Sequence, residues 1–248
     1  MASELGAVVL GARDVGGAII DRLLAENWRV AGIARNPQTL DRVRDRGALP
    51  LRADLRDPAG IGAALRTAAV EFGRLDLVVN ATTPARPVPG EPPGGGPVAD
   101  AELAGFQRWT GAMAEAAFVF LTESVRVLRA SGPGGCLIQL VNGVAGGSWP
   151  GEDGLLAAGY GAVRALVRTA AAELRAEGIR ACLLAVDAPV DSPRTAPLLV
   201  SNGLPSDAAV GLAEVAEAVA FLAGQGRRGT CQELTLTSLG WTGARQSA

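Results

Sequence analysis

Seven short apolar runs alternate with amphipathic helical segments along this chain. Turn and cap signals such as Asn36-Pro37 and Asp57-Pro58 separate the runs from the helices. Such alternation predicts an α/β fold: a doubly wound parallel sheet of about seven strands with helices on both faces. Because the alternation has no break, we expect a single domain over residues 1–248. The predicted strands are Leu5–Leu10, Trp28–Ala34, Leu49–Ala53, Leu75–Val79, Cys136–Val141, Ile179–Val186 and Glu233–Thr237.

Two irregular stretches interrupt this pattern. Residues 82–100 are too rich in Pro and Gly for a helix or a central strand, so we expect a surface loop. Residues 187–211 form a second, Pro/Ser-containing loop at the carboxyl edge of the predicted sheet. Between the two loops we expect long helices over Ala101–Ala130 and from Tyr160 to about Glu177.

Composition and charge exclude several classes of function. The net charge of -2 gives no electrostatic footprint for nucleic acid, and no apolar run is long enough to span a membrane. The three cysteines lie in strand-like runs and their number is odd, which favours reduced, buried thiols and a cytoplasmic protein. The chain has neither His nor Lys, so a Ser-His-Asp triad, a His metal site and a lysine Schiff base are excluded. We expect no metal.

A glycine-rich turn follows the first predicted strand. Gly11, Arg13, Gly16 and Gly17 stand between that strand and the first helix. Such a turn directs backbone N–H groups and a helix N-terminus at one point, which suits a pyrophosphate. The alternative is purely structural, because tight strand-to-helix turns require glycine in any case.

Polar residues follow the next three strands, where a doubly wound sheet places its binding site. Arg35 follows the second strand, Asp54 the third, and Asn80-Ala81 the fourth. These positions are therefore candidates for contacts with a bound ligand.

Tyr160, the only tyrosine, stands four residues before Arg164. On a helix the two side chains lie one turn apart on the same face. A phenol beside a cation loses its proton more easily, which suits acid/base chemistry on a carbonyl. The alternative is a structural tyrosine with an arginine along the helix.

The chain resembles the short-chain dehydrogenase/reductase family over nearly its full length. The resemblance rests on four features that occur in the family's order: the glycine turn, Asp54, Asn80-Ala81 and Tyr160. The resemblance implies a Rossmann-like fold, an NAD(H) or NADP(H) cofactor, and a small-molecule substrate that is reduced or oxidised. It also implies a homodimer or homotetramer formed through the two long helices. Arg13 and Arg35 favour NADP(H), because guanidinium matches phosphate, unless both are solvated surface residues.

The chain departs from the family pattern at several positions. Arg164 replaces the family's lysine, Gly143 replaces the serine that orients the carbonyl, and an alanine near Ala114 replaces the asparagine. Val15 stands at the second glycine of the turn and Asp187 near the usual Pro-Gly, and both argue against tight cofactor binding.

This combination of retained and replaced family residues leaves three candidate functions. The first is a redox-neutral elimination, isomerisation or cyclisation of a small, polyketide-like biosynthetic substrate, with Tyr160 as acid/base and Asn142 and Ser148 on the surrounding loops. The second is an NADP(H)-dependent carbonyl reductase in which Arg164 replaces lysine, and Ser148 or Asn142 replaces the missing hydroxyl. The third is a non-catalytic subunit of a related enzyme. The redox-neutral reaction is favoured, because the tyrosine is retained while the residues that assist hydride transfer are replaced.

Overall fold

A seven-stranded parallel sheet forms the centre of the protein, which we describe from a computed structural model covering residues 5–82, 93–142, 154–201, 203–226 and 228–241. The strand order is β3-β2-β1-β4-β5-β6-β9, and every pair is parallel. The order reverses between β1 and β4, as in a doubly wound sheet. The strands are β1 (Gly6–Leu10), β2 (Arg29–Ala34), β3 (Leu49–Arg52), β4 (Leu77–Asn80), β5 (Gly135–Asn142), β6 (Ile179–Val186) and β9 (Glu233–Leu236).

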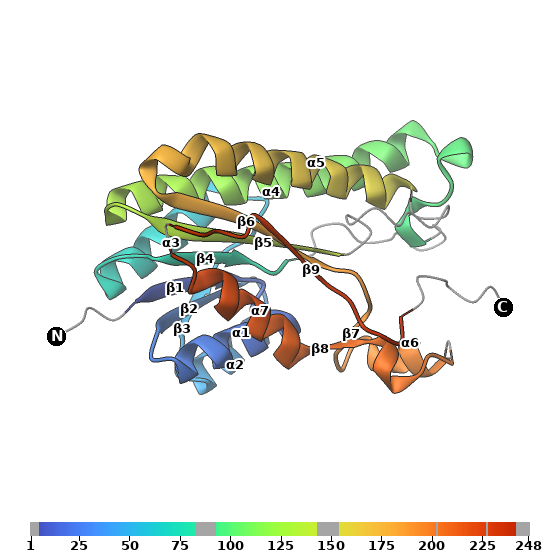
Figure 1. The fold of residues 1–248 in the computed structure, drawn as a ribbon, viewed down its shortest axis with the longest axis horizontal. Coiled ribbons are helices and arrows are strands. Elements are labelled where there is room, and N and C mark those ends of the chain that lie inside the picture. Colours follow the sequence, from blue (N-terminus) through green and yellow to red (C-terminus); the bar gives the residue numbers. More distant parts are fainter. Residues whose placement is uncertain (1–4, 83–92, 143–153, 202, 227, 242–248) are drawn as a thin grey trace.

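Helices cover both faces of the sheet, so the predicted α/β fold is confirmed (Figure 1). One face carries α1 (Asp14–Ala25), α2 (Pro37–Asp45) and α7 (Leu212–Ala223), and the other carries α3 (Pro58–Phe72), α4 (Leu103–Ser131) and α5 (Gly154–Glu173). The central strands are apolar on both faces because both faces are covered.

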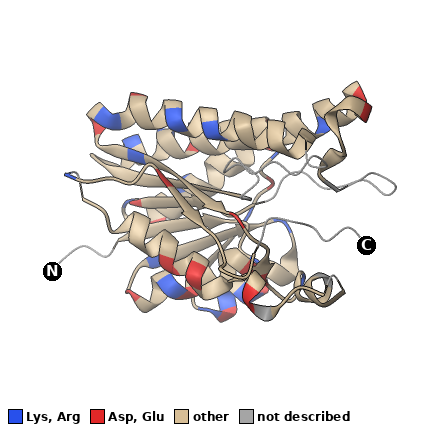
Figure 2. Cartoon of the chain, turned by 45° about the vertical axis from the view of Figure 1, so that its right-hand side comes forward, with Lys and Arg blue, Asp and Glu red and all other residues tan. Residues whose placement is uncertain are grey.

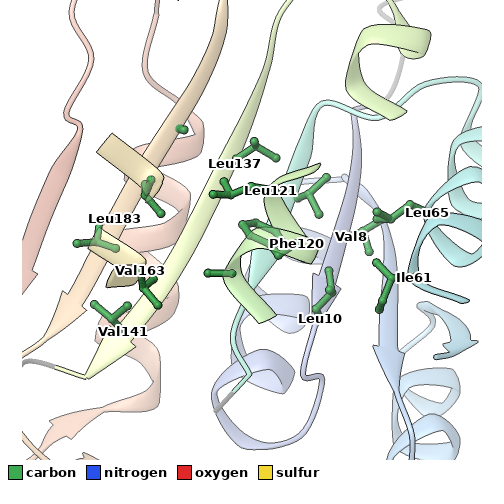
Figure 3. Packing of buried hydrophobic residues seen from close by; sticks show 14 of the residues in the cluster. Val8, Leu10, Ile61, Leu65, Phe120, Leu121, Leu137, Val141, Val163 and Leu183 are labelled. Atoms are coloured by element: carbon green, nitrogen blue, oxygen red, sulfur yellow. The ribbon is translucent and has the colours of Figure 1, made fainter. Parts of the chain in front are cut away.

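The core under α4 is built around Phe120, which is fully buried. Figure 3 shows this ring beside Leu121 on α4, with Leu137 on β5 close by. Burying a phenylalanine side chain contributes about 1.5–3 kcal/mol, so this contact anchors α4 to the sheet.

The helix that carries Tyr160 begins earlier than the sequence analysis predicted. In the described residues α5 runs from Gly154, so Tyr160 lies in its second turn and does not open it. Leu155 extends the apolar face of α5 by one turn because it is buried against Gly95. At its other end α5 gives way at Glu173 to a 3₁₀ turn, η4 (Leu174–Glu177). α4 starts at Leu103, two residues after the predicted start.

The stretch 187–211 is more structured than the expected loop. It contains α6 (Ala196–Ser201), a 3₁₀ turn over Ser206–Ala208, and a small parallel pair of strands, β7 (Val190–Asp191) and β8 (Val210–Gly211). Side-chain hydrogen bonds explain part of this order: the Ser192 backbone N–H donates to Thr195 Oγ1 at 3.1 Å. This segment projects beyond the sheet at the lower right of Figure 1. The described part of the first loop forms two 3₁₀ turns, η1 (Pro93–Gly95) and η2 (Val98–Asp100).

The cysteines only partly follow the prediction. Cys136 and Cys182 are buried in β5 and β6, whereas Cys231 is half-buried and precedes β9, because the last strand begins only at Glu233. All three are free thiols. Charged residues lie mainly on the outer helices (Figure 2). Of the helices described, none is long and apolar enough to cross a membrane.

Candidate functional site

The turn between β1 and α1 is closed by two glycines. Gly11 has a positive φ of 86°, and a Cβ there would lie 2.9 Å from the Ala81 carbonyl oxygen. A Cβ on Gly16 would lie 2.3 Å from the Gly11 carbonyl oxygen, closer than atoms can approach. Both positions therefore require glycine, and α1 begins in direct contact with the end of β1. The first N–H groups of a helix have no partner within it, so this end of α1 suits an anion.

Val15 does not obstruct this turn in the way the sequence suggested. Its half-buried side chain packs with the core cluster under α1 and α7. The close approach is made by Gly16, one residue after the family's second glycine, whereas Gly17 faces the Arg46 guanidinium. The close contact of the turn is therefore kept one position later than in the family pattern, and the start of α1 can still direct its N–H groups at a phosphate. The residues of the turn thus fit the phosphates of a dinucleotide.

Two charged side chains stand at the start of α1. Arg13 is exposed, and its Nε lies 3.2 Å from the Asp14 carboxylate. Asp14 occupies the first turn of the helix, where a negative charge is favourable. Its carboxylate would compete with a bound phosphate for the same positive end of the helix.

A cluster of one carboxylate and two guanidiniums lies at the carboxyl ends of β2 and β3. Asp54 Oδ2 lies 3.3 Å from Arg35 Nη1 and 2.9 Å from Arg56 Nη2. The Arg56 guanidinium and, to a smaller degree, Arg35 hold the pKa of the Asp54 carboxyl well below its usual range. Arg56 was not predicted from the sequence, although a cation two residues after Asp54 was a usable signal.

Asn80 ends β4 and lies in a buried hydrogen-bonded group with Gln139, which stands in the middle of β5. Its Nδ2 donates to Gln139 Oε1 at 2.9 Å, and Thr82 donates to Asn80 Oδ1 through its backbone N–H at 3.1 Å and its hydroxyl at 2.7 Å. The Ala81 N–H donates to the Leu10 carbonyl at 2.9 Å, which holds this segment beside the glycine turn. Gln139 was also missed, although a glutamine in an otherwise apolar strand was the signal.

Tyr160 is buried on α5, the helix that packs against α4. Its side chain is 7% exposed and belongs to the same cluster as Trp109 and Met113. The neighbouring Gly159 allows this approach, since a Cβ there would lie 2.5 Å from Met113 Sδ. Tyr160 is therefore part of the apolar core on this face of the sheet.

Arg164 is bound to a carboxylate that the sequence analysis did not consider. Its Nε and Nη2 lie 3.1 Å and 2.9 Å from the two carboxylate oxygens of Glu233, the first residue of β9. Arg168, one turn further along α5, lies 3.9 Å from the same carboxylate. The cation at the family's lysine position is thus paired with the edge strand of the sheet.

The remaining candidates are only partly visible. Asn142 ends β5, but its side chain, like Gly143 and Ser148, lies outside the described residues. Asp187 directly follows β6, and its backbone N–H donates to the Leu236 carbonyl at 2.6 Å. Ala114 lies in the middle of α4. Over the described part of the chain, no group of three or more acidic, Cys or His residues could hold a metal ion.

Comparisons with known proteins agree with this architecture. Residues 9–242 match the family described as enoyl-(acyl carrier protein) reductase. The chain is 30% identical over 239 residues to cis-4-hydroxycyclohexanecarboxylate dehydrogenase from Sinomonas cyclohexanicum, which covers 89% of this chain and 90% of the relative.

Solved structures show the same fold. A dehydrogenase/reductase from Sinorhizobium meliloti 1021 superposes with a TM-score of 0.75 at 26% identity and covers 100% of this chain and 96% of that one. A short-chain dehydrogenase from Burkholderia cenocepacia J2315 in complex with NADP gives a TM-score of 0.75 at 23% identity, covering 98% of this chain and 100% of that one. The resemblance drawn from the sequence is confirmed, and the chain belongs to the short-chain dehydrogenase/reductase family of oxidoreductases.

Proposed function

We propose that this chain is an NADP(H)-dependent oxidoreductase that binds its nucleotide across the carboxyl ends of β1 to β4. The observation that carries the proposal is the turn in which Gly16 meets the Gly11 carbonyl, so that α1 begins in direct contact with the end of β1 and its first N–H groups lie at the carboxyl edge of the sheet. Because Val15 packs into the core, the main objection from the sequence to cofactor binding loses its force.

The arginines at the ends of β2 and β3 support NADP(H) over NAD(H). Arg35 and Arg56 flank Asp54, and both are more than half exposed at 55% and 78%. A guanidinium presents several N–H donors to a phosphate and is the preferred partner for a 2′-phosphate at this place. Arg13, exposed at the glycine turn, is a third candidate for a phosphate contact.

Calorimetry of purified protein with NADPH and NADH tests this proposal. We expect NADPH to bind more tightly than NADH, and Arg35→Ala and Arg56→Ala each to weaken NADPH binding about tenfold, the equivalent of about 1.4 kcal/mol. Arg44→Ala is the matched control, because Arg44 is also on the surface but pairs with Asp41 in the last turn of α2. Equal affinity for the two nucleotides, or no binding of either at millimolar concentration, would contradict the proposal.

Tyr160 is the proposed proton donor and acceptor. A bound NADP(H) would supply or accept the hydride, while the phenol would donate a proton to the substrate oxygen or take it back. The apolar surroundings of Tyr160 favour a small, largely apolar organic substrate. The similarity to a dehydrogenase of a hydroxycyclohexane carboxylate supports an alicyclic alcohol or ketone, a class that includes polyketide-like biosynthetic intermediates.

Turnover of an alicyclic ketone panel with NADPH is the direct assay. Tyr160→Phe should lower kcat by about 10²–10⁴ with little change in NADPH affinity, because it removes only the proton in transfer. A Tyr160→Phe variant that retains full turnover would exclude this role.

A redox-neutral reaction at Tyr160 is the second candidate, and the Arg164–Glu233 pair favours it. In the family the residue at position 164 serves the cofactor and the tyrosine, whereas here its guanidinium meets the Glu233 carboxylate through two nitrogen atoms. Elimination, isomerisation or cyclisation requires an acid/base but no hydride. Product formation from a polyketide-like substrate without consumption of NADPH would support this candidate, and loss of the reaction on Tyr160→Phe would assign it to the same site.

The long helices α4 and α5 are the proposed interface of a homodimer or homotetramer. Phe118 on α4 is 57% exposed and would be covered at such an interface. Phe118→Asp should convert the oligomer to a monomer in analytical ultracentrifugation. Phe221→Asp on α7, at 58% exposure, is the matched control.

A further inference from the structure

Arg164 joins α5 to the edge strand of the sheet through two parallel contacts. The Nε and Nη2 atoms meet the two oxygens of Glu233 at 3.1 Å and 2.9 Å. Glu233 is the first residue of β9, which pairs with β6 at the edge of the seven-stranded sheet, with Glu233 opposite Leu183. A two-point contact between a planar guanidinium and a carboxylate fixes direction as well as distance. The side chain that shares a helical face with Tyr160 therefore has its charged end held by β9.

The same contact balances the charge of Arg164. Glu233 also lies 3.9 Å from Arg168, so one carboxylate stands between two guanidiniums of α5. The Arg164 and Glu233 side chains are only 37% and 22% exposed, so solvent screens this pair less than a surface pair. A phenol one helical turn away experiences the sum of these charges and not that of Arg164 alone.

Among the described residues, few other charges stand near Tyr160 and Arg164. β5 contains none, and the charge of β6, Arg180, is directed to the Leu222 and Ala223 carbonyls on the opposite face. On α4, Arg108 and Glu115 are exposed, while the buried Glu123 pairs with Arg126 and faces Gly62 of α3. Glu152 and Asp153, which precede α5, lie outside the described residues. Asp187 directly follows β6, and Asp191 lies in the short strand β7.

We propose that Glu233 is a positioning residue for Tyr160: it holds Arg164 and offsets its charge, and thereby sets the pH at which Tyr160 gives up its proton. The proposal rests on the proposed function only in taking Tyr160 as the proton-transferring group. Its consequence is that native Tyr160 stays protonated at higher pH than it would beside an unpaired arginine. The site is thus better suited to giving a proton to a substrate than to taking one at neutral pH.

The ionisation of Tyr160 can be measured without a substrate because the chain has one tyrosine. Ultraviolet absorbance of tyrosinate during a pH titration reports this side chain alone, and Tyr160→Phe gives the blank. We expect Glu233→Gln to move the midpoint to lower pH by about 0.5–1 unit, the effect of one uncompensated charge about a helical turn away in a partly exposed site.

Glu177→Gln is the matched control. Glu177 accepts a two-point contact from Arg129, at 2.6 Å and 2.7 Å, beyond the opposite end of α5 from Tyr160. The Glu177→Gln substitution also removes a carboxylate that pairs with a guanidinium, so it reproduces any general loss of stability. We expect no shift of the Tyr160 midpoint in this variant.

A double-mutant cycle tests whether Glu233 acts on Tyr160 through Arg164. Arg164→Gln should raise the midpoint, because it leaves the Glu233 carboxylate, and the double variant Arg164→Gln with Glu233→Gln should return close to the native value. The proposal would be overturned if the midpoint of Glu233→Gln equals that of the native protein or lies above it. It would also be overturned if adding Arg164→Gln to Glu233→Gln leaves the midpoint unchanged. Circular dichroism of the same samples checks folding; should Glu233→Gln not fold, Glu233→Asp, which shortens the carboxylate arm, must shift the midpoint in the same direction.

The titration also separates this proposal from the proposed function. The midpoint shift requires neither NADPH nor turnover, so it would stand even if no nucleotide binds. Conversely, Arg35→Ala would still test nucleotide binding if Glu233 had no effect on Tyr160.

Discussion

Replacement of Gly16 by Ala tests the contact on which the nucleotide site depends. The added Cβ would lie 2.3 Å from the Gly11 carbonyl oxygen and 2.9 Å from its carbon, both of them backbone atoms. Backbone cannot rotate away as a side chain does, so α1 must move away from the end of β1. Overpacking of this kind costs about 1–3 kcal/mol, and the severity of the contact places it at the upper end.

The helical position of Gly16 acts in the opposite direction. Alanine is more favourable than glycine inside a helix by about 1 kcal/mol. The net loss in the free energy of unfolding is therefore about 2 kcal/mol, which lowers Tm by about 4–8 °C in a protein of this size. Affinity for NADPH should fall as well, since the turn itself is displaced.

Gly161→Ala is the control, because Gly161 is also inside a helix but nothing lies within 4 Å of the position of its Cβ. This substitution should raise the free energy of unfolding by up to about 1 kcal/mol. Urea denaturation and thermal melts of the two variants give the comparison. A Gly16→Ala protein as stable as Gly161→Ala would refute the closed turn.

Three further predictions follow from the charges of the structure. Asp14→Asn should raise NADPH affinity about two- to fivefold in calorimetry, because it removes about 0.3–1 kcal/mol of competition for the start of α1; an unchanged affinity would place the phosphate elsewhere. Arg56 and Arg35 depress the pKa of Asp54, so the carboxylate stabilises the fold above its unfolded pKa of about 3.9 and loses this effect as the pH falls towards its folded pKa. Asp54→Asn should therefore lower the free energy of unfolding at neutral pH, and urea denaturation near pH 3 should show a smaller difference from the native protein. Arg180→Gln should cost about 1–2 kcal/mol, because Arg180 donates to the Leu222 and Ala223 carbonyls at 2.5 Å and 2.8 Å and so caps α7; thermal melts that show no loss would refute the cap.

Much of the fold could be predicted because its signals are local. The apolar runs and cap residues were sufficient for the seven strands of the parallel sheet. Segment 187–211 was less predictable, because the β7–β8 pair joins residues about twenty positions apart and is too short to leave a periodic pattern. The start of α5 at Gly154 depended on a contact between Leu155 and Gly95 that no local pattern reports.

The residues at the carboxyl edge of the sheet could be identified from the sequence, because a strand followed by a glycine turn or a polar residue defines that edge. The pairing of those residues, by contrast, depends on how the chain folds. Gly16, and not Gly17, approaches Gly11 because the direction of α1 selects the contact. Arg164 meets Glu233, a residue 69 positions later, because β9 pairs with β6 beneath α5. Periodicity along a chain reports burial, whereas the partner of a buried or half-buried charge depends on which distant segments the fold brings together.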